Sequence, residues 1–246
     1  MKHSFLDRYS DMDSWIHSLD PRAKFISFFT AIVLMVAEPR GEVLCFIYYF
    51  VLIFFIIGLS RIPLHFYLKR LSITLPFILF AALLLPFSYL FSNEKEASFP
   101  VANMALSLGL KAIAAVLLLL ILTSTGKFHR LLKGLRKLKM PDAIGQISAV
   151  MYRYIFILND ERLRALRAKE SRTPGKLRTS AFRVYGHLAA QVFLRSWERA
   201  HIVYNSMLSR GFTGNFPEYE EMSIRAFDVV FSIIFIAGFC IIRIWL

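Results

Sequence analysis

The chain has 246 residues, of which 57% are hydrophobic, and a formal net charge of +13. Soluble domains are about 45–50% apolar, so this composition, with 24 phenylalanines, indicates a membrane protein. In a membrane protein, an excess of Lys and Arg first indicates cytoplasmic loops. No aromatic RNA-binding motif or zinc-finger spacing supports nucleic acid as a partner. The two cysteines, Cys45 and Cys240, form no CxxC pair, which argues against disulfide or metal chemistry.

Apolar runs predict an all-α, polytopic fold with about five transmembrane helices. The segments are Phe25–Ala37, Val43–Ser60, Leu71–Phe91, Val101–Thr125 and Ala226–Leu246. The first is short, about 20 Å at roughly 1.5 Å per residue, and Lys24 can lengthen it by extending its ammonium group to the interface. Just before this span, we expect Asp20 to be a helix N-cap and Pro21 to take the first helical position. Pro76 and Pro86 lie inside the third and are expected to kink or break it.

Basic residues lie mainly on one side of these spans. Residues 126–225 carry nineteen of them, and residues 1–24 and 61–70 carry more. The opposite loops, Glu38–Glu42 and Ser92–Phe99, hold one basic residue each and are net acidic. The positive-inside rule therefore predicts a multi-pass protein of the cell (inner) membrane with a cytoplasmic N-terminus and an external C-terminus.

The apolar segment Ala143–Leu158 is a candidate sixth span. Basic stretches flank it on both sides and Arg153 interrupts it, so both ends favour the cytoplasm. We expect an interfacial or protein-buried helix, and its embedding in the membrane stays open. The predicted organisation is residues 1–125 with the first four spans, a cytoplasmic helical arm over 126–225, and the last span over 226–246.

The arm is predicted to contain three helical stretches. Lys127–Lys139 is basic and amphipathic, a second helix runs from Pro141-Asp142 to about Arg172, and Leu177–Arg210 carries further helix. The last stretch has an apolar stripe made of Ala189, Phe193, Ser196, Ala200, Val203 and Met207. Gly211 is well placed to cap its C-terminus.

The second and third helices end alike, at Ser171-Arg172 and, 38 residues later, at Ser209-Arg210. We call these two cationic helix ends, at Arg172 and Arg210, the tips. Two similar tips suit a protein that binds two copies of one partner. A simpler interpretation is that basic residues near a helix C-terminus only interact with its dipole.

Several segments together resemble the T component of energy-coupling factor (ECF) transporters, in its CbiQ-type metal-uptake branch. They are Leu19–Lys24 (LDPRAK), Arg153–Glu161 (RYIFILNDE), Arg164–Arg172, and residues 195–214, which read RSWERAHIVYNSMLSRGFTG. The last is the most specific match, and the similarity covers nearly the whole chain.

The resemblance implies a non-catalytic subunit without cofactors. In that family the T component couples two ABC-type ATPases to a membrane S component that binds the substrate, and Arg tips dock in ATPase grooves. The corresponding residues here are Arg172 and Arg210, with Ser171, Ser209 and Gly211 beside them. The second motif reads Ser-Arg-Gly where the family usually has Ala-Arg-Gly. The first departs further from the family pattern, and Arg167 competes with Arg172. The branch favours cobalt or nickel, while a vitamin substrate stays open.

Two rival functions remain from the residues alone. Asp11 and Asp13 form a DxD that could hold Mg²⁺ in a membrane transferase, although a solvated tail is the simpler interpretation. A self-contained permease would need intramembrane charges, and Lys111 is the only basic residue well inside a predicted span. The six histidines form no metal-binding motif, and the segment Thr123–Lys127 lacks the first glycine of a phosphate loop.

Overall fold

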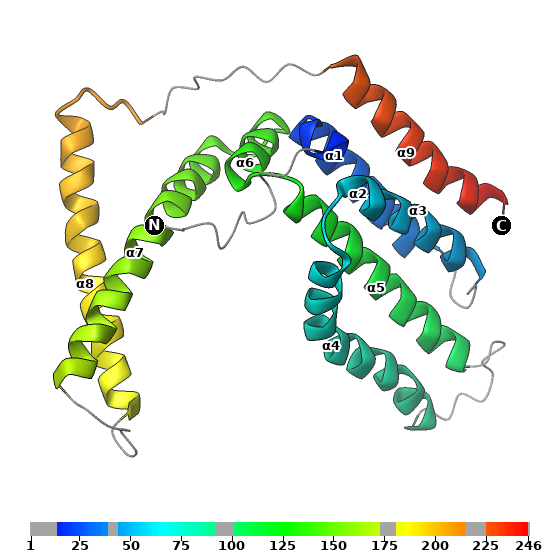
Figure 1. Cartoon of the computed structure of the whole chain (residues 1–246), viewed down its shortest axis with the longest axis horizontal. Helices are drawn as coiled ribbons and strands as arrows, with labels where there is room; N and C mark the ends of the chain where they lie inside the picture. Colours follow the sequence, from blue (N-terminus) through cyan, green and yellow to red (C-terminus); the bar gives the residue numbers. More distant parts are fainter. Residues whose placement is uncertain (1–13, 39–43, 92–100, 173–180, 215–224, 246) are drawn as a thin grey trace. The chain divides into compact units, whose positions relative to one another are not determined.

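The computed structural model describes residues 14–38, 44–91, 101–172, 181–214 and 225–245 (Figure 1). Every regular element in these ranges is an α-helix, which confirms the predicted all-α class. In chain order they are α1 (Trp15–Ser18), α2 (Pro21–Val36), α3 (Leu44–Ser60), α4 (Leu64–Phe91), α5 (Val101–Ser124), α6 (Phe128–Lys137), α7 (Asp142–Arg172), α8 (Ala181–Leu208) and α9 (Ala226–Trp245). The chain forms two compact units, residues 1–139 with 222–246, and residues 140–221.

The first unit is built around α2, which packs against α5, α6 and α9. Phe28, Ala31 and Met35 recur at helical spacing along α2 and are fully buried. Phe28 contacts Phe235 of α9, with ring centroids 5.2 Å apart. Helix α3 packs against α5 and α9, and α4 packs against α5. The apolar face of α2 therefore forms the centre of this unit.

Three of the described helices are long and apolar enough to cross a membrane. These are α4, over Leu64–Leu84, α5, over Asn103–Ser124, and α9, over Ala226–Arg243. Helix α3 supplies a shorter apolar stretch, Cys45–Ser60. Helix α2 has 16 residues, about 24 Å at 1.5 Å per residue, and is thus shorter than the roughly 30 Å of a hydrocarbon core. Helices thus occupy all five predicted segments, and the chain is a membrane protein.

The fourth helix differs from its prediction in two respects. It begins at Leu64 rather than Leu71, and it continues through Pro76 and Pro86, so the predicted break is wrong, while the alternative of a kink stays a prediction. A membrane helix tolerates proline because side-chain hydroxyl groups and neighbouring helices can satisfy the freed backbone groups.

Helix α6 belongs to the first unit, although its sequence is basic and amphipathic like the predicted arm. It packs against the start of α2. A Cβ atom added at Gly134 would lie 2.9 Å from Cβ of Pro21, so only glycine permits this approach. The compact unit outside the membrane helices consequently begins at Met140 rather than at residue 126.

The second unit is an antiparallel pair of long helices, α7 and α8. Near one end of the pair, Lys169 Nζ of α7 donates to the Tyr185 hydroxyl of α8 at 3.3 Å. Near the other end, Gln146 of α7 and Met207 of α8 line one pocket. Ala143–Leu158 is the first half of α7, which is not among the described helices long and apolar enough to span a membrane. Its interfacial position stays a prediction.

Candidate coupling surface

The end of α8 is a Schellman motif. The Phe212 N–H donates to the Met207 carbonyl oxygen at 3.0 Å, and the Gly211 N–H donates to that of Leu208 at 2.9 Å. Gly211 has φ +79°, in the left-handed region that favours glycine. The predicted cap at Gly211 is therefore confirmed.

Arg210 is the last residue before this cap and is exposed. The Ser209 hydroxyl beside it donates to the carbonyl oxygen of Asn205 at 3.0 Å, within its own helix. Within the described ranges, the guanidinium of Arg210 makes no hydrogen bond or ion pair. The motif thus holds the backbone of the tip and leaves the Arg210 charge open to solvent.

The end of α7 repeats this arrangement at the serine. The Ser171 hydroxyl donates to the Ala168 carbonyl oxygen at 3.0 Å, and Arg172 is exposed as the last residue of the helix. The rival candidate Arg167 is also exposed, but its Nε donates to the carbonyl oxygen of Leu163 at 3.3 Å. Arg172 therefore resembles Arg210 more closely than Arg167 does, and the choice between them as docking residue stays a prediction.

Because α7 and α8 are antiparallel, their C-terminal tips lie at opposite ends of the pair. Helix α8 has 28 residues, so it is about 42 Å long at 1.5 Å per residue. Arg172 and Arg210 are separated by roughly that length. The two tips are therefore two separate cationic surfaces.

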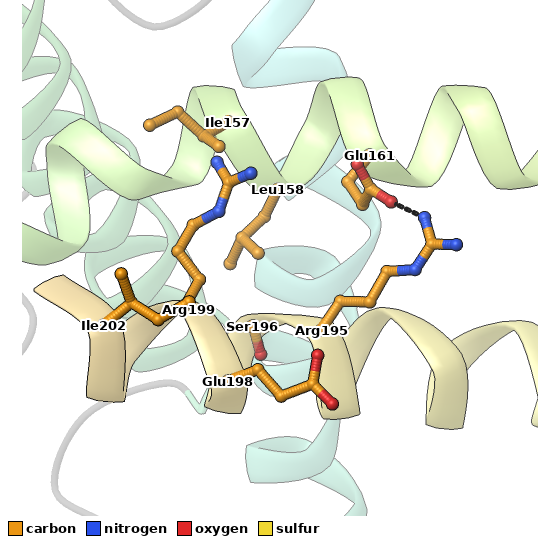
Figure 2. Close-up of a pocket in the computed structure, with 8 residues that line it drawn as sticks. All are labelled: Ile157, Leu158, Glu161, Arg195, Ser196, Glu198, Arg199 and Ile202. Atoms are coloured by element: carbon orange, nitrogen blue, oxygen red, sulfur yellow. Dashed lines mark hydrogen bonds and ion pairs between the residues drawn. The ribbon is translucent and has the colours of Figure 1, made fainter.

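The two helices are joined in the middle by a charged contact that the sequence did not predict (Figure 2). Arg195 of α8 forms a hydrogen-bonded ion pair with Glu161 of α7, and Arg164 lies 3.8 Å from the same carboxylate. The hydrogen bond from Arg195 holds the pKa of Glu161 below its ordinary value. Glu161 and Arg195 line a groove of about 480 Å³ that Arg199 also lines. The pairing depends on the register of two helices, which the composition of each helix does not reveal.

An apolar groove of about 450 Å³ lies between the helices toward the Arg210 end. Val203 and Met207, both from the predicted stripe of α8, line it with Tyr154 of α7 and with Phe212. Large apolar side chains also remain exposed on both helices: Ile144, Ile147, Met151 and Ile155 on α7, and Phe182, Phe193, Trp197 and Ile202 on α8. Exposed apolar surface of this extent is typical of a face that another protein or a membrane covers.

The other predicted candidates have structural contacts or lie outside the described residues. Lys111 Nζ donates to the carbonyl oxygens of Glu38 at 2.6 Å and Val36 at 3.1 Å. The Thr125 hydroxyl, just beyond α5, donates to the Ile121 carbonyl oxygen in the last turn of that helix at 2.8 Å. Asp11 and Asp13 lie outside the described residues. Within the described ranges, no three His, Cys, Asp or Glu side chains form a group that could hold a metal ion.

Asp228 is a buried carboxylate that the sequence-based interpretation missed. It lies in the first turn of α9 and is 3% exposed. Its Oδ1 accepts from the backbone N–H of Asp20 at 3.0 Å, and its Oδ2 accepts from that of Arg225 at 2.9 Å. Asp20 itself caps α2, accepting from the Arg22 N–H at 2.8 Å as the sequence indicates. An acidic residue at the start of an apolar span was the available signal.

These features define an all-α membrane protein with a separate unit of two long basic helices. Residues 12–221 match the sequence profile of the CbiQ cobalt transport protein family, so the chain belongs to that family. The chain is 26% identical over 247 residues to an energy-coupling factor transporter transmembrane protein EcfT of Staphylococcus aureus, covering 92% of this chain and 90% of the relative. It is 27% identical over 270 residues to an EcfT of Leuconostoc gelidum, covering 100% and 99%. A putative fused cobalt transport protein CbiMQ of Methanocorpusculum labreanum is 30% identical over 129 residues, 52% of this chain and 21% of that protein.

Proposed function

We propose that this protein is the transmembrane coupling subunit of an ATP-driven ECF-type uptake transporter for cobalt or nickel ions. The observation that carries the proposal is the pair of exposed Ser-Arg helix ends, at Arg172 and Arg210, at opposite ends of one antiparallel pair. Membership of the CbiQ family and similarity to EcfT proteins support it.

In this proposal each tip docks in a groove of one ABC-type ATPase. Arginine suits such a contact because its guanidinium offers five donors in a rigid fork that matches carboxylates and helix-end carbonyl groups. When ATP binding brings the two ATPases together, the grooves carry the two tips with them. The Glu161–Arg195 contact joins α7 to α8 between the tips, so displacement of one helix is passed to the other.

The chain itself performs no chemistry in this mechanism. Its exposed apolar faces on α7 and α8 are the surfaces that shift against an S component, which binds the substrate. Cobalt or nickel is the proposed substrate because the family and the CbiMQ relative carry cobalt transport in their names. The substrate is determined by the S component and not by a metal site in this chain.

We further propose that the protein lies in the cell (inner) membrane with its N-terminus in the cytoplasm. The distribution of Lys and Arg supports this orientation, since nineteen basic residues fall within 126–225. The second unit then lies on the side of the membrane where ATP is available.

The proposal is tested by reconstituting the chain with a pair of ABC-type ATPases and a metal-type S component encoded beside it. ATP-dependent accumulation of ⁵⁷Co²⁺ or ⁶³Ni²⁺ in proteoliposomes is expected only when all components are present. Uptake by this chain alone, without ATP, would show a self-contained permease. Uptake of a vitamin by the full complex, with no metal uptake, would confirm the coupling role and contradict the proposed metal substrate.

A further inference from the structure

Buried polar groups collect at the N-terminus of α2. They join α2 to the ends of α5 and α9 and lie next to the contact of α2 with α6. We call this cluster, with the close contact of Pro21 and Gly134 beside it, the α2 junction; its polar groups are the backbone N–H of Asp20, Lys24, the Thr125 carbonyl and Asp228. All of its members lie in the first unit.

One side of the junction holds the start of α9. Asp228 accepts from the Arg225 N–H, which caps α9 in the manner of a capping box. The same carboxylate accepts from the backbone N–H of Asp20 at 3.0 Å. One buried side chain therefore fixes the first turn of α9 to the first turn of α2.

The other side of the junction holds the segment that follows α5. Lys24 Nζ is buried and donates to the Thr125 carbonyl oxygen at 3.1 Å and to that of His17 at 3.3 Å. Gly134 of α6 lies against Pro21 so closely that an added Cβ would approach Cβ of Pro21 to 2.9 Å. The end of α5 and the middle of α6 are thus both held on the first turn of α2.

These two sides are also the two places where the second unit is joined to the first. The chain enters the second unit after Lys139, just beyond α6, and returns from it at Met222, just before α9. Both covalent connections of the second unit therefore meet the first unit within a few residues of the α2 junction.

We propose that the α2 junction is the relay through which movement of the second unit reaches the transmembrane helices, with Asp228 and Lys24 as its positioning residues. This inference rests on the proposed coupling function. It adds a role for residues of the first unit.

The opposite end of α2 is tied as well. Lys111 of α5 donates to the Glu38 carbonyl oxygen, and Arg243 of α9 lies 4.0 Å from the Glu38 carboxylate. Because α2 is tied to α5 and α9 at both of its ends, a displacement applied at the junction is passed to both helices. Helix α4 contributes no group to the junction and packs chiefly against α5, so we expect α9 to shift relative to α4 and the separation of these two helices to change.

The relay is tested by measuring that separation in the complete complex with its ATPases. After Cys45→Ala and Cys240→Ala, nitroxide labels are placed at Phe80 of α4, which is 66% exposed, and at Ile234 of α9, which is 67% exposed. The distance between the two labels is then measured by double electron–electron resonance with and without a non-hydrolysable ATP analogue. The test variant is Asp228→Asn, because an amide has one acceptor oxygen where the carboxylate uses two.

Two control variants separate the relay from general effects at the same place. Ser232→Ala removes the hydroxyl that donates to the Asp228 carbonyl oxygen at 2.8 Å but leaves the tie to α2. Asp20→Ser keeps a side chain that can cap α2, and the bond to Asp228 uses the Asp20 backbone. In both controls, the label-to-label distance should change on nucleotide binding as it does in the wild type. In Asp228→Asn this change should be lost, while the distance without nucleotide and the binding of the ATPases should remain as in the wild type.

Each remaining outcome is decisive. A wild-type shift in Asp228→Asn would overturn the relay and leave the proposed function intact. A nucleotide-free distance that already differs in Asp228→Asn would mean that the carboxylate only holds the fold, which also overturns the relay. A wild-type complex with no shift would refute the proposed coupling itself.

Discussion

Arg172 is the last residue of α7 and Arg210 lies two residues beyond the end of α8, and the antiparallel packing of these helices places the two residues at opposite ends of the pair. Each follows a serine whose hydroxyl donates back into its own helix. The two tips are therefore separate, about 42 Å apart for a helix of 28 residues. Each can be altered without changing the other.

The cap of α8 is expected to control how Arg210 is presented. Gly211→Ala places a Cβ on a residue with φ +79°, which costs about 1–2 kcal/mol in the left-handed conformation. We expect a lower unfolding temperature and weaker ATPase binding. Gly186→Ala is the matched control, because Gly186 lies inside α8 with no atom within 4 Å of an added Cβ. It should stabilise the helix by about 1 kcal/mol, and equal effects of the two variants would contradict this explanation.

The close contact between α6 and α2 predicts that Gly134→Ala is destabilising. The added Cβ would meet Pro21 at 2.9 Å, and the Pro21 backbone carbon lies 3.3 Å away, so relief requires movement of a helix. Overpacking of this kind typically costs about 1–3 kcal/mol. Gly109→Ala in α5 is the control, since the nearest atom there is Cβ of Ala82 at 4.0 Å. In thermal unfolding of the purified chain, Gly134→Ala should have a lower unfolding temperature than Gly109→Ala. Similar unfolding temperatures would show that α6 can move to accommodate the added Cβ.

The Glu161–Arg195 contact predicts a pH dependence at the acidic end of the range. The pKa of Glu161 is lowered by the hydrogen bond from Arg195, from an ordinary value of 4.5. The stabilisation is therefore fully present above about pH 4.5 and is lost as pH falls through the lowered pKa. The unfolding temperatures of wild type and Glu161→Gln should differ near neutral pH and converge in acid. Glu198→Gln changes an exposed carboxylate of the same groove, and its unfolding temperature should follow that of the wild type at every pH. A difference in unfolding temperature between wild type and Glu161→Gln that did not vary with pH would contradict the account.

The orientation in the membrane predicts a pattern of chemical accessibility. In a background without Cys45 and Cys240, a cysteine at residue 96 should react with an impermeant reagent from outside. Cysteines at residues 137 and 178 should react only from inside, because Lys and Arg concentrate on that side. If residue 178 reacted from outside, Ala143–Leu158 would span the membrane and both tips could not face the cytoplasm.

The elements that are set by local sequence were predicted well. The Asp20 cap of α2 and the Gly211 cap of α8 depend on neighbouring residues only, and both are present. Apolar runs likewise locate the membrane helices, since burial in a bilayer needs composition and length rather than a particular partner.

The elements that depend on packing were not predicted. The sequence predicted helix α6 as part of the basic arm, yet the helix packs on α2 because Gly134 allows contact with Pro21. Helix α4 continues through Pro76, although proline commonly breaks helices in water. The bond between Asp228 and Asp20 joins residues 208 positions apart, and no local pattern reveals such a contact. Docking of Arg172 and Arg210 on ATPases also stays a prediction, because it requires partner chains.

The most direct measurement of the central claim is ATP-driven uptake of ⁵⁷Co²⁺ or ⁶³Ni²⁺ by the reconstituted complex with Arg210→Lys, beside Arg172→Lys. Docking needs one guanidinium in one geometry, so both variants should lose most uptake although the charge is kept. Arg164→Lys is the matched control, because that guanidinium is 68% exposed near the middle of α7 and an exposed ion pair contributes little. Lys137→Ala controls for attraction of the basic face to anionic lipid, which is summed over many charges at about 1 kcal/mol each. Wild-type uptake by Arg210→Lys and Arg172→Lys, with severe loss in Lys137→Ala, would show that the basic surface and not the two tips is the functional contact.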